Sequence, residues 1–159
     1  MNKLTTFILT ILLSSLPVIA NAQVNGYLKA FITAEDPETL EYWYDHTADC
    51  TWTEVEAKNV IEGVIKRSRI KTEHGAGGPN RVFLNITARC LEITTRGHTA
   101  YLDVRFGEYN SVRGSLLYEK SYGNLLTTPS KQFGLNELKT YIENAVTDFV
   151  EVNFLSETD

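Results

Sequence analysis

The stretch RVFLNITARCLEI, residues 81–93, decides the fold of this chain. Its apolar side chains stand at every second position from Val82 to Cys90, and polar residues such as Asn85 and Arg89 stand between them. This period of two is typical of a β-strand that turns one face to a core and the other face to solvent. We therefore predict a strand at the centre of a sheet here.

Four further segments alternate in the same way and predict the rest of the sheet. After the turn residues TTRGHT, residues 100–109 form one predicted strand and residues 115–122 form the next. Upstream, residues 26–33 and 64–71 alternate as well. Successive strands with one polar face usually form an antiparallel sheet that carries helices on its apolar side.

Two main helices are predicted beside these strands. One begins near Thr53, which has the spacing of a capping box with Glu56, and it ends at Gly63. The other, within residues 134–155, carries a continuous apolar stripe. Asp36 is an N-cap candidate that predicts only a short helical turn. The sequence thus indicates an α+β fold, with an antiparallel sheet of about four to five strands and two main helices packed on one face.

The N-terminal residues predict export. Residues 1–22 have a basic residue at Lys3, an apolar run and a small-residue A-x-A site, which is the layout of a secretory signal peptide. The apolar run is shorter than the ~20 residues of a membrane-spanning helix, so no membrane insertion is expected after cleavage. We expect residues 23–159 to form a single α+β domain that is periplasmic or secreted.

The charge of the chain limits its partners. The net charge is −5, and removal of Lys3 with the signal peptide leaves 14 basic residues against 20 acidic ones. Nucleic acids and anionic membranes are bound mostly through an excess of Lys and Arg. We therefore expect no nucleic acid partner.

The two cysteines, Cys50 and Cys90, are predicted to form a disulfide. In an oxidising compartment this is the usual state of such a pair. The alternatives, a metal-binding pair or a redox pair, would require C-x-x-C spacing or nearby histidines. Neither is found in this sequence.

The glycine-rich segment IKTEHGAGGPNRV, residues 70–82, has two interpretations. Glycine-rich loops that bind phosphate lead into the N-terminus of a helix. Here the predicted strand follows the glycines instead, so the segment is predicted to be a hairpin connection between two strands.

The segment EYWYDH also has two interpretations. Exposed aromatic rings next to carboxylates bind sugars or peptides. Alternatively, Trp43 and Trp52 fill the core of a small domain, and this is the interpretation that we favour from sequence.

The basic residues suggest a binding face. Arg67, Arg69 and Lys71 share one face of the strand predicted over 64–71, and Arg89 and Arg105 extend that face on neighbouring strands. Such a cationic face would suit an acidic protein or an anionic glycan. The alternative is an ordinary solvated face on which arginines pair with acids across strands.

A metal or catalytic site has only one weak candidate, the cluster Asp45, His46 and Asp49. No cofactor motif is present, so no cofactor is expected. The leading hypothesis is an exported, non-catalytic binding or accessory module of the cell envelope that recognises a protein or glycan partner. The alternatives are a small envelope hydrolase or metal-dependent enzyme centred on these three residues, and a secreted inhibitor or immunity protein.

Overall fold

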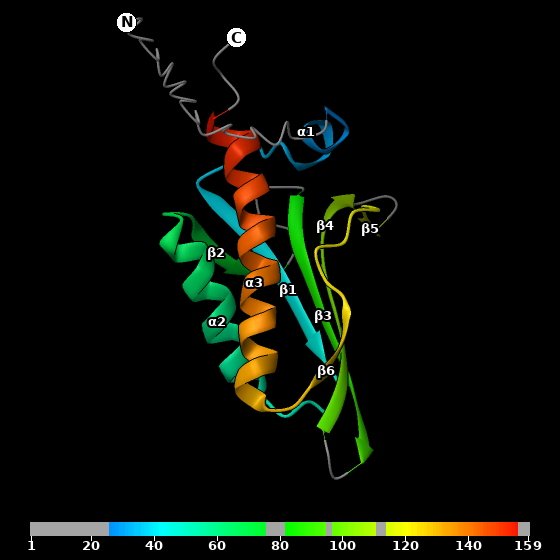
Figure 1. The fold of residues 1–159 in the computed structure, drawn as a ribbon. Coiled ribbons are helices and arrows are strands. Elements are labelled where there is room, and N and C mark those ends of the chain that lie inside the picture. The colour runs from blue at the N-terminus through cyan, green and yellow to red at the C-terminus, as the bar shows by residue number, and fades with distance from the viewer. Residues whose placement is uncertain (1–25, 76–81, 95–96, 111–113, 156–159) are drawn as a thin grey trace, which may run out of the picture.

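The computed structural model describes residues 26–75, 82–94, 97–110 and 114–155 (Figure 1). The fold is α+β, as the sequence predicts. The elements in chain order are α1 (Gly26–Ile32), β1 (Thr39–His46), α2 (Glu54–Arg67), β2 (Lys71–His74), β3 (Val82–Thr94), β4 (Gly97–Asn110), β5 (Gly114–Leu117), β6 (Leu125–Thr128), α3 (Lys131–Val150) and a π-helical turn (Glu151–Leu155).

The sheet is mixed, so the prediction of a purely antiparallel sheet is wrong. Its strand order is β2-β1-β3-β4-β5, and β6 also pairs with β4. β1 pairs in parallel with both β2 and β3, whereas β3, β5 and β6 all pair antiparallel with β4. The parallel pair of β1 and β2 arises because α2 carries the chain back along the sheet, so that β2 enters in the same direction as β1.

The predicted capping box at the start of α2 is confirmed. The Thr53 hydroxyl accepts a hydrogen bond from the Glu56 N–H at 3.2 Å, and the Glu56 carboxylate accepts one from the Thr53 N–H at 2.9 Å. The helix does not end at Gly63 but continues to Arg67.

The strand predicted over 64–71 is therefore wrong for most of its length. Val64 and Ile65 are buried on the same helical stripe as Ile61, and this packing overrides a short alternation that fits either structure. The chain reverses at Arg69, which has a positive φ of 62°. Only then does β2 begin.

The strand predicted over 26–33 is also wrong, because this segment forms α1. A contact with the distant C-terminal turn holds its end. The side chain of Asn153 donates a hydrogen bond to the Ile32 carbonyl at 2.9 Å and accepts one from the Ala34 N–H at 2.8 Å. A sequence window cannot reveal a constraint from residues so far along the chain.

Asp36 caps a turn rather than a helix. Its carboxylate accepts a hydrogen bond from the Glu38 N–H at 3.2 Å, and its carbonyl accepts one from the Thr39 N–H at 3.2 Å. The extended strand β1 follows at once, so the predicted helical turn is wrong.

The hairpin predicted around residues 70–82 is wrong as well. β2 and β3 lie on opposite sides of β1 and both run parallel to it. They are therefore not hairpin partners. Of its glycines, Gly75 has a positive φ of 125°, and Gly77 and Gly78 lie outside the described residues.

The long strands β3 and β4 confirm the strands predicted over 81–93 and 100–109. The chain that follows β4 is less regular than predicted. Only the first part of 115–122 is a strand. The chain then follows β4 through single hydrogen bonds, from the Tyr118 N–H to the Phe106 carbonyl and from the Tyr122 N–H to the Val104 carbonyl, each at 2.9 Å. It re-forms a ladder only at β6.

The apolar stripe of α3 is confirmed and lies in one core with α2 and the sheet. Figure 1 shows α2 and α3 next to each other in front of the strands. The stripe of α3 that reaches this core consists of Gly134, Leu135, Leu138, Ile142, Ala145, Val146 and Phe149.

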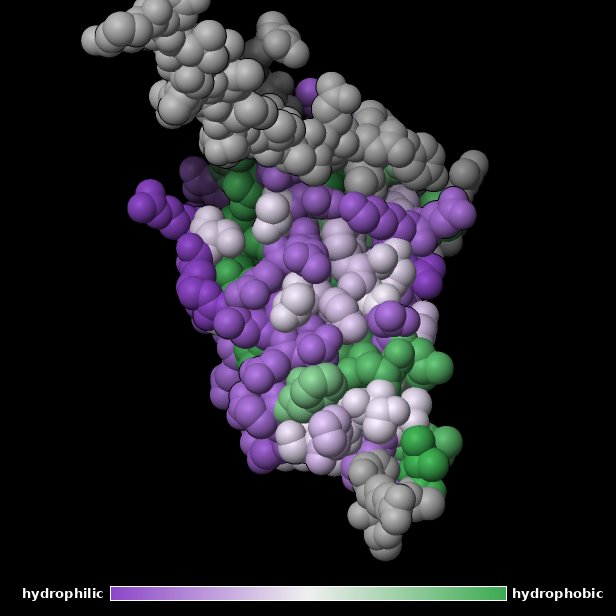
Figure 2. All heavy atoms as spheres, in the orientation of Figure 1, coloured by the Kyte–Doolittle hydropathy of each residue, from purple (hydrophilic) through white to green (hydrophobic). Residues whose placement is uncertain are grey.

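The surface on the side of α2 and α3 is mainly hydrophilic (Figure 2). Hydrophobic residues gather at its lower end. None of the helices in the described parts of the chain is long and apolar enough to cross a membrane.

Candidate functional site

The two faces of the sheet differ in burial. Even-numbered residues along the middle of β1, β3 and β4, such as Tyr42, Ile86 and Val104, form the inner face and lie in the core. We call the opposite side the outer face. It consists of the odd-numbered residues of these three strands and of Leu125 and Thr127 on β6, which pair with Tyr101 and Thr99. Its residues Thr39, Glu41, Phe83 and Asp103 are buried, and the others named below are more exposed.

Trp43 lies on the outer face with 48 % of its surface exposed, so the prediction that it fills the core is wrong. Trp52 does lie in the core, where its indole N–H donates to the Tyr44 hydroxyl at 2.9 Å. The difference follows from the strand, because the side chain of Trp43 points away from those of Tyr42 and Tyr44.

The predicted basic residues do not share one face. Arg67 lies at the end of α2 and forms an ion pair with Glu143, with 3.3 Å between Nη2 and Oε1. Arg69 occupies the turn after that helix. Lys71 begins β2, and its ammonium group lies 3.6 Å from the Glu38 carboxylate. These three residues do not lie on one strand, because the first half of the strand predicted over 64–71 belongs to α2.

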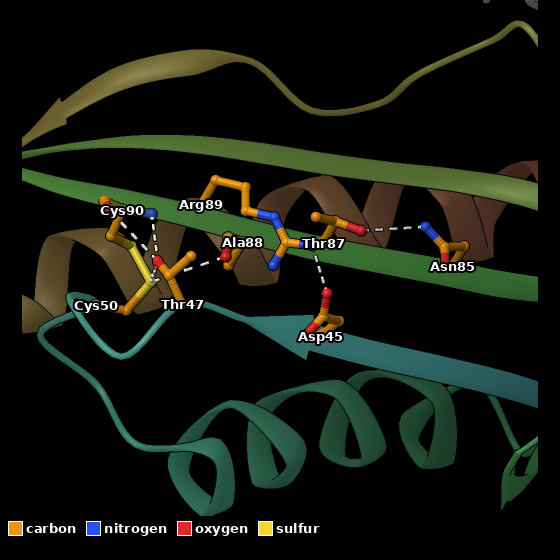
Figure 3. A network of polar contacts seen from close by, with 8 residues as sticks. All are labelled: Asp45, Thr47, Cys50, Asn85, Thr87, Ala88, Arg89 and Cys90. Atoms are coloured by element: carbon orange, nitrogen blue, oxygen red, sulfur yellow. Dashed lines mark hydrogen bonds and ion pairs between the residues drawn. A yellow bond between two sulfur atoms is a disulfide. The ribbon is translucent and has the colours of Figure 1, made fainter.

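Arg89 and Arg105 do lie on the outer face, and each has an acidic partner there. The Arg89 guanidinium donates to the Asp45 carboxylate at 2.5 Å (Figure 3). The Arg105 Nε donates to Asp103 at 2.8 Å. The hydrogen bond from Arg89 lowers the pKa of Asp45, and the hydrogen bond to Asp103 raises the pKa of Arg105. The charge of this part of the outer face is therefore balanced rather than cationic.

The strand register arranges these residues in rows across the outer face. Acids occupy one row, and an arginine stands in the row on each side of it. The four rows are Trp43–Asn85–Arg105, Asp45–Thr87–Asp103, Arg89–Tyr101–Leu125 and Leu91–Thr99–Thr127.

Hydrogen bonds fix the polar side chains within these rows. The Asn85 amide donates to the Thr87 hydroxyl at 3.3 Å, and both side chains project from β3 on the same side as Arg89 in Figure 3. Asp103 accepts a further hydrogen bond from the Ser121 hydroxyl at 2.5 Å, which ties the irregular segment after β5 to β4. The polar groups are thus positioned before any partner arrives.

Four large apolar or aromatic side chains are exposed in these rows: Trp43, Leu91, Tyr101 and Leu125, with 48 %, 65 %, 39 % and 62 % of their surface exposed. Ile93, with 54 % exposed, lies beyond the rows at the irregularity between Glu92 and Thr94. Several large apolar side chains exposed on one face of a protein often mark an interaction site. The outer face is therefore the strongest candidate for a functional site.

The sequence contains a signal for this face that the prediction missed. In TLEYWYDH the alternation puts Glu41, Trp43 and Asp45 on one side, which becomes visible only if the segment is assigned to a strand. Leu91 and Ile93 occupy the positions at which the central strand should continue its polar face. Two apolar residues at such positions indicate a contact surface.

The cluster Asp45, His46 and Asp49 does not converge. Asp45 points to the outer face, whereas the ring of His46 stacks on the core residue Tyr44 with 5.3 Å between centroids. Asp49 lies exposed in the turn after β1. Across the parts of the chain that the structure describes, no three His, Cys, Asp or Glu residues are grouped so that they could hold a metal ion.

The predicted disulfide between Cys50 and Cys90 is confirmed. It joins the turn before α2 to β3, where Cys90 lies in the core. The Thr47 hydroxyl accepts from the Cys90 N–H at 2.9 Å and also lies 3.3 Å from the Cys90 carbonyl (Figure 3). Together these bonds close the end of β1 onto the longer strand β3.

A small cavity of about 230 Å³ lies beside α1. Its lining is both aromatic and acidic, with Phe31, Tyr118, Glu35 and Glu108 among its residues. The volume is below the range of about 300 to 1,000 Å³ that is usual for small-molecule sites. The outer face is thus the more extensive candidate site.

Comparison with known proteins gives no family: no protein-family model matches the chain, and no curated protein matches it.

Proposed function

We propose that this chain is an exported, non-catalytic binding module that recognises a protein or an anionic glycan through its outer face. The observation that carries the proposal is the exposure of Trp43, Tyr101, Leu91 and Leu125 beside hydrogen-bonded polar groups on this face. Rigid aromatic rings beside oriented polar groups are typical of recognition surfaces.

A protein partner fits the charge of this face better than an anionic glycan. Arg89 and Arg105 are already paired with Asp45 and Asp103. A sulfate or carboxylate group would have to approach these acids to reach the arginines, which weakens its attraction. A protein surface can instead cover the aromatic rings and satisfy both signs of charge.

The export part of the proposal rests on two observations. Residues 1–22 have the layout of a signal peptide. The disulfide between Cys50 and Cys90 is compatible with an oxidising compartment such as the periplasm or the extracellular medium.

The proposal is tested with one face variant and one control. The face variant combines Trp43→Ser and Tyr101→Ser, and the control is Val55→Ser, since Val55 is 67 % exposed on α2. Immobilised wild-type and variant proteins are incubated with extracts of the producing cells and with a glycan array. We expect the face variant to lose the proteins or glycans that the wild type and control retain. Equal retention by all three, with unchanged circular dichroism spectra, would exclude the outer face as the binding site.

A further inference from the structure

We infer that the partner of the outer face is a second copy of this chain, docked face to face about a two-fold axis. The inference rests on the proposed function, because it names the partner of the same surface. Its evidence is the charge pattern of the rows, the position of the apolar residues and the size of the exposed face.

The charge pattern of the outer face is complementary to itself. The row of Asp45 and Asp103 is flanked on one side by Arg105 and on the other by Arg89. If a two-fold axis lies across the strands between the rows of Thr87 and Arg89, the acidic row of each copy faces the Arg89 row of the other. Asp45, whose side chain is exposed, then lies near Arg89 of the other copy twice, once on each side of the axis. Asp103 is only 8 % exposed and contributes little to this contact.

The same axis brings apolar side chains together. The row of Trp43 precedes the row of Asp45, and the row of Leu91 follows the row of Arg89. The axis therefore places the row of Trp43 of one copy over the row of Leu91 of the other. Both side chains are about half exposed or more in the single chain. A symmetric dimer of this kind therefore covers the row of Trp43 and the row of Leu91 in both copies.

Net charge favours this face over the rest of the surface for self-association. The chain carries a net charge of −5, so two copies repel each other on average. Within the four rows, Asp45 is paired with Arg89 and Asp103 with Arg105, which makes these rows a neutral area on an acidic protein. A second acidic chain can approach there with the least repulsion.

The area of the outer face determines the affinity that we expect for the dimer. Eight residue steps along β3, from Asn85 to Ile93, span about 27 Å, and the strands from β1 to β6 span about 14 Å. This is a flat area of roughly 300 to 400 Å², about half of the ~800 Å² that each partner contributes to a standard interface. We therefore expect a reversible dimer of micromolar rather than nanomolar affinity.

Analytical ultracentrifugation of the purified mature chain tests this dimer over a range of about 1 μM to 1 mM. The wild type should pass from monomer to dimer within this range. Leu91→Glu should raise the dissociation constant at least about tenfold, because it buries a carboxylate against Trp43 of the other copy. Val55→Glu, a change of matched exposure on α2, should leave it unchanged. A wild type that stays monomeric at 1 mM, or equal weakening by both variants, overturns the inference.

Crosslinking provides a second measurement that does not depend on a loss of binding. Both native cysteines are joined in the disulfide, so an introduced cysteine is the reactive thiol. Thr87→Cys lies next to the inferred axis and should give a covalent dimer with a short bismaleimide, whereas Val55→Cys should give little. Equal yields from the two positions would contradict the arrangement.

The two proposals fail in different ways. If the chain stays monomeric and the Trp43→Ser, Tyr101→Ser variant still loses an extract protein, a glycan or added lipid vesicles, then self-association is wrong and the outer face remains a binding site. If the chain dimerises but Leu91→Glu and Thr87→Cys behave like their controls, the dimer uses another surface and the inference is again overturned.

Discussion

Trp52 packs so closely against Gly134 that no side chain fits at that glycine. A Cβ atom on Gly134 would lie 2.3 Å from Cζ3 of Trp52. The indole is 2 % exposed and is held by its hydrogen bond to the Tyr44 hydroxyl. This contact fixes the distance between the first turn of α3 and the segment that leads into α2.

Gly134→Ala should therefore destabilise the protein, although alanine is the better helix former. Overpacking costs about 1 to 3 kcal/mol, and the gain in helix propensity returns at most about 1 kcal/mol. We expect a net loss of about 1 to 2 kcal/mol in the free energy of unfolding, measured by urea denaturation. Gly63→Ala is the matched control in α2.

The control should change stability in the opposite direction. A Cβ on Gly63 would have the Arg67 guanidinium as its nearest neighbour, at an ordinary 3.5 Å. We expect a gain of about 0.5 to 1 kcal/mol from helix propensity alone. Stabilisation by both substitutions would show that the ring of Trp52 yields easily.

The Cys50–Cys90 disulfide should contribute a large share of the stability. It closes a loop of 40 residues, for which the chain-entropy model gives about 3 to 4 kcal/mol. The Cys50→Ala, Cys90→Ala double variant should lose about this amount in urea denaturation. Dithiothreitol should lower the stability of the wild type and have no effect on the double variant. A wild type unaffected by complete reduction would refute this role.

Glu56 should make stability depend on acid pH. Its hydrogen bond from Lys131 at 2.7 Å and those from Thr53 lower its pKa from 4.5 to about 2. The folded state thus favours the ionised carboxylate. Its contribution is complete above about pH 4.5 and is lost as the pH falls towards 2.

The measurement is the difference in unfolding free energy between the wild type and Glu56→Gln at several pH values. This difference should favour the wild type near pH 6 and shrink steadily below pH 4.5. A difference that stays constant from pH 6 to pH 2 would show that the carboxylate charge has no part in capping α2 or in binding Lys131.

Sequence patterns predicted the long elements of this fold and failed on the short ones. The thirteen residues of β3 and the twenty of α3 repeat their periods often enough to be unambiguous. α1 and the end of α2 each offered only a few alternating residues, which fit a helix or a strand equally well. In these segments, contacts with residues far away in the sequence determine whether the chain forms a helix or a strand. An example is Asn153, which forms hydrogen bonds with the end of α1.

The candidate site was predictable only in part, for a related reason. The prediction that Arg89 and Arg105 lie on the solvent face is confirmed, because the strands that carry them, β3 and β4, are predicted correctly. Their pairing with Asp45 and Asp103 depends on which strands are neighbours, and a parallel pair formed by β1 and β3 was not expected. Trp43 was placed in the core because its strand had not been identified.

The hydrogen bond between Trp52 and Tyr44 provides a last prediction. Tyr44→Phe leaves the buried indole N–H without this acceptor, which should cost about 1 to 3 kcal/mol in unfolding free energy. Tyr109→Phe is the control, because Tyr109 is 38 % exposed at the far end of β4. We expect its stability to stay within about 0.5 kcal/mol of the wild type.

Burial of the Tyr44 phenol should also make the stability of the protein depend on alkaline pH. Burial raises the pKa of Tyr44 from 10 to about 12, so the folded state favours the neutral phenol. That contribution is complete below pH 10 and is lost as the pH rises towards 12. The stability advantage of the wild type over Tyr44→Phe should therefore shrink above pH 10. An advantage that is unchanged at pH 11 would contradict the preference of the folded state for the neutral phenol.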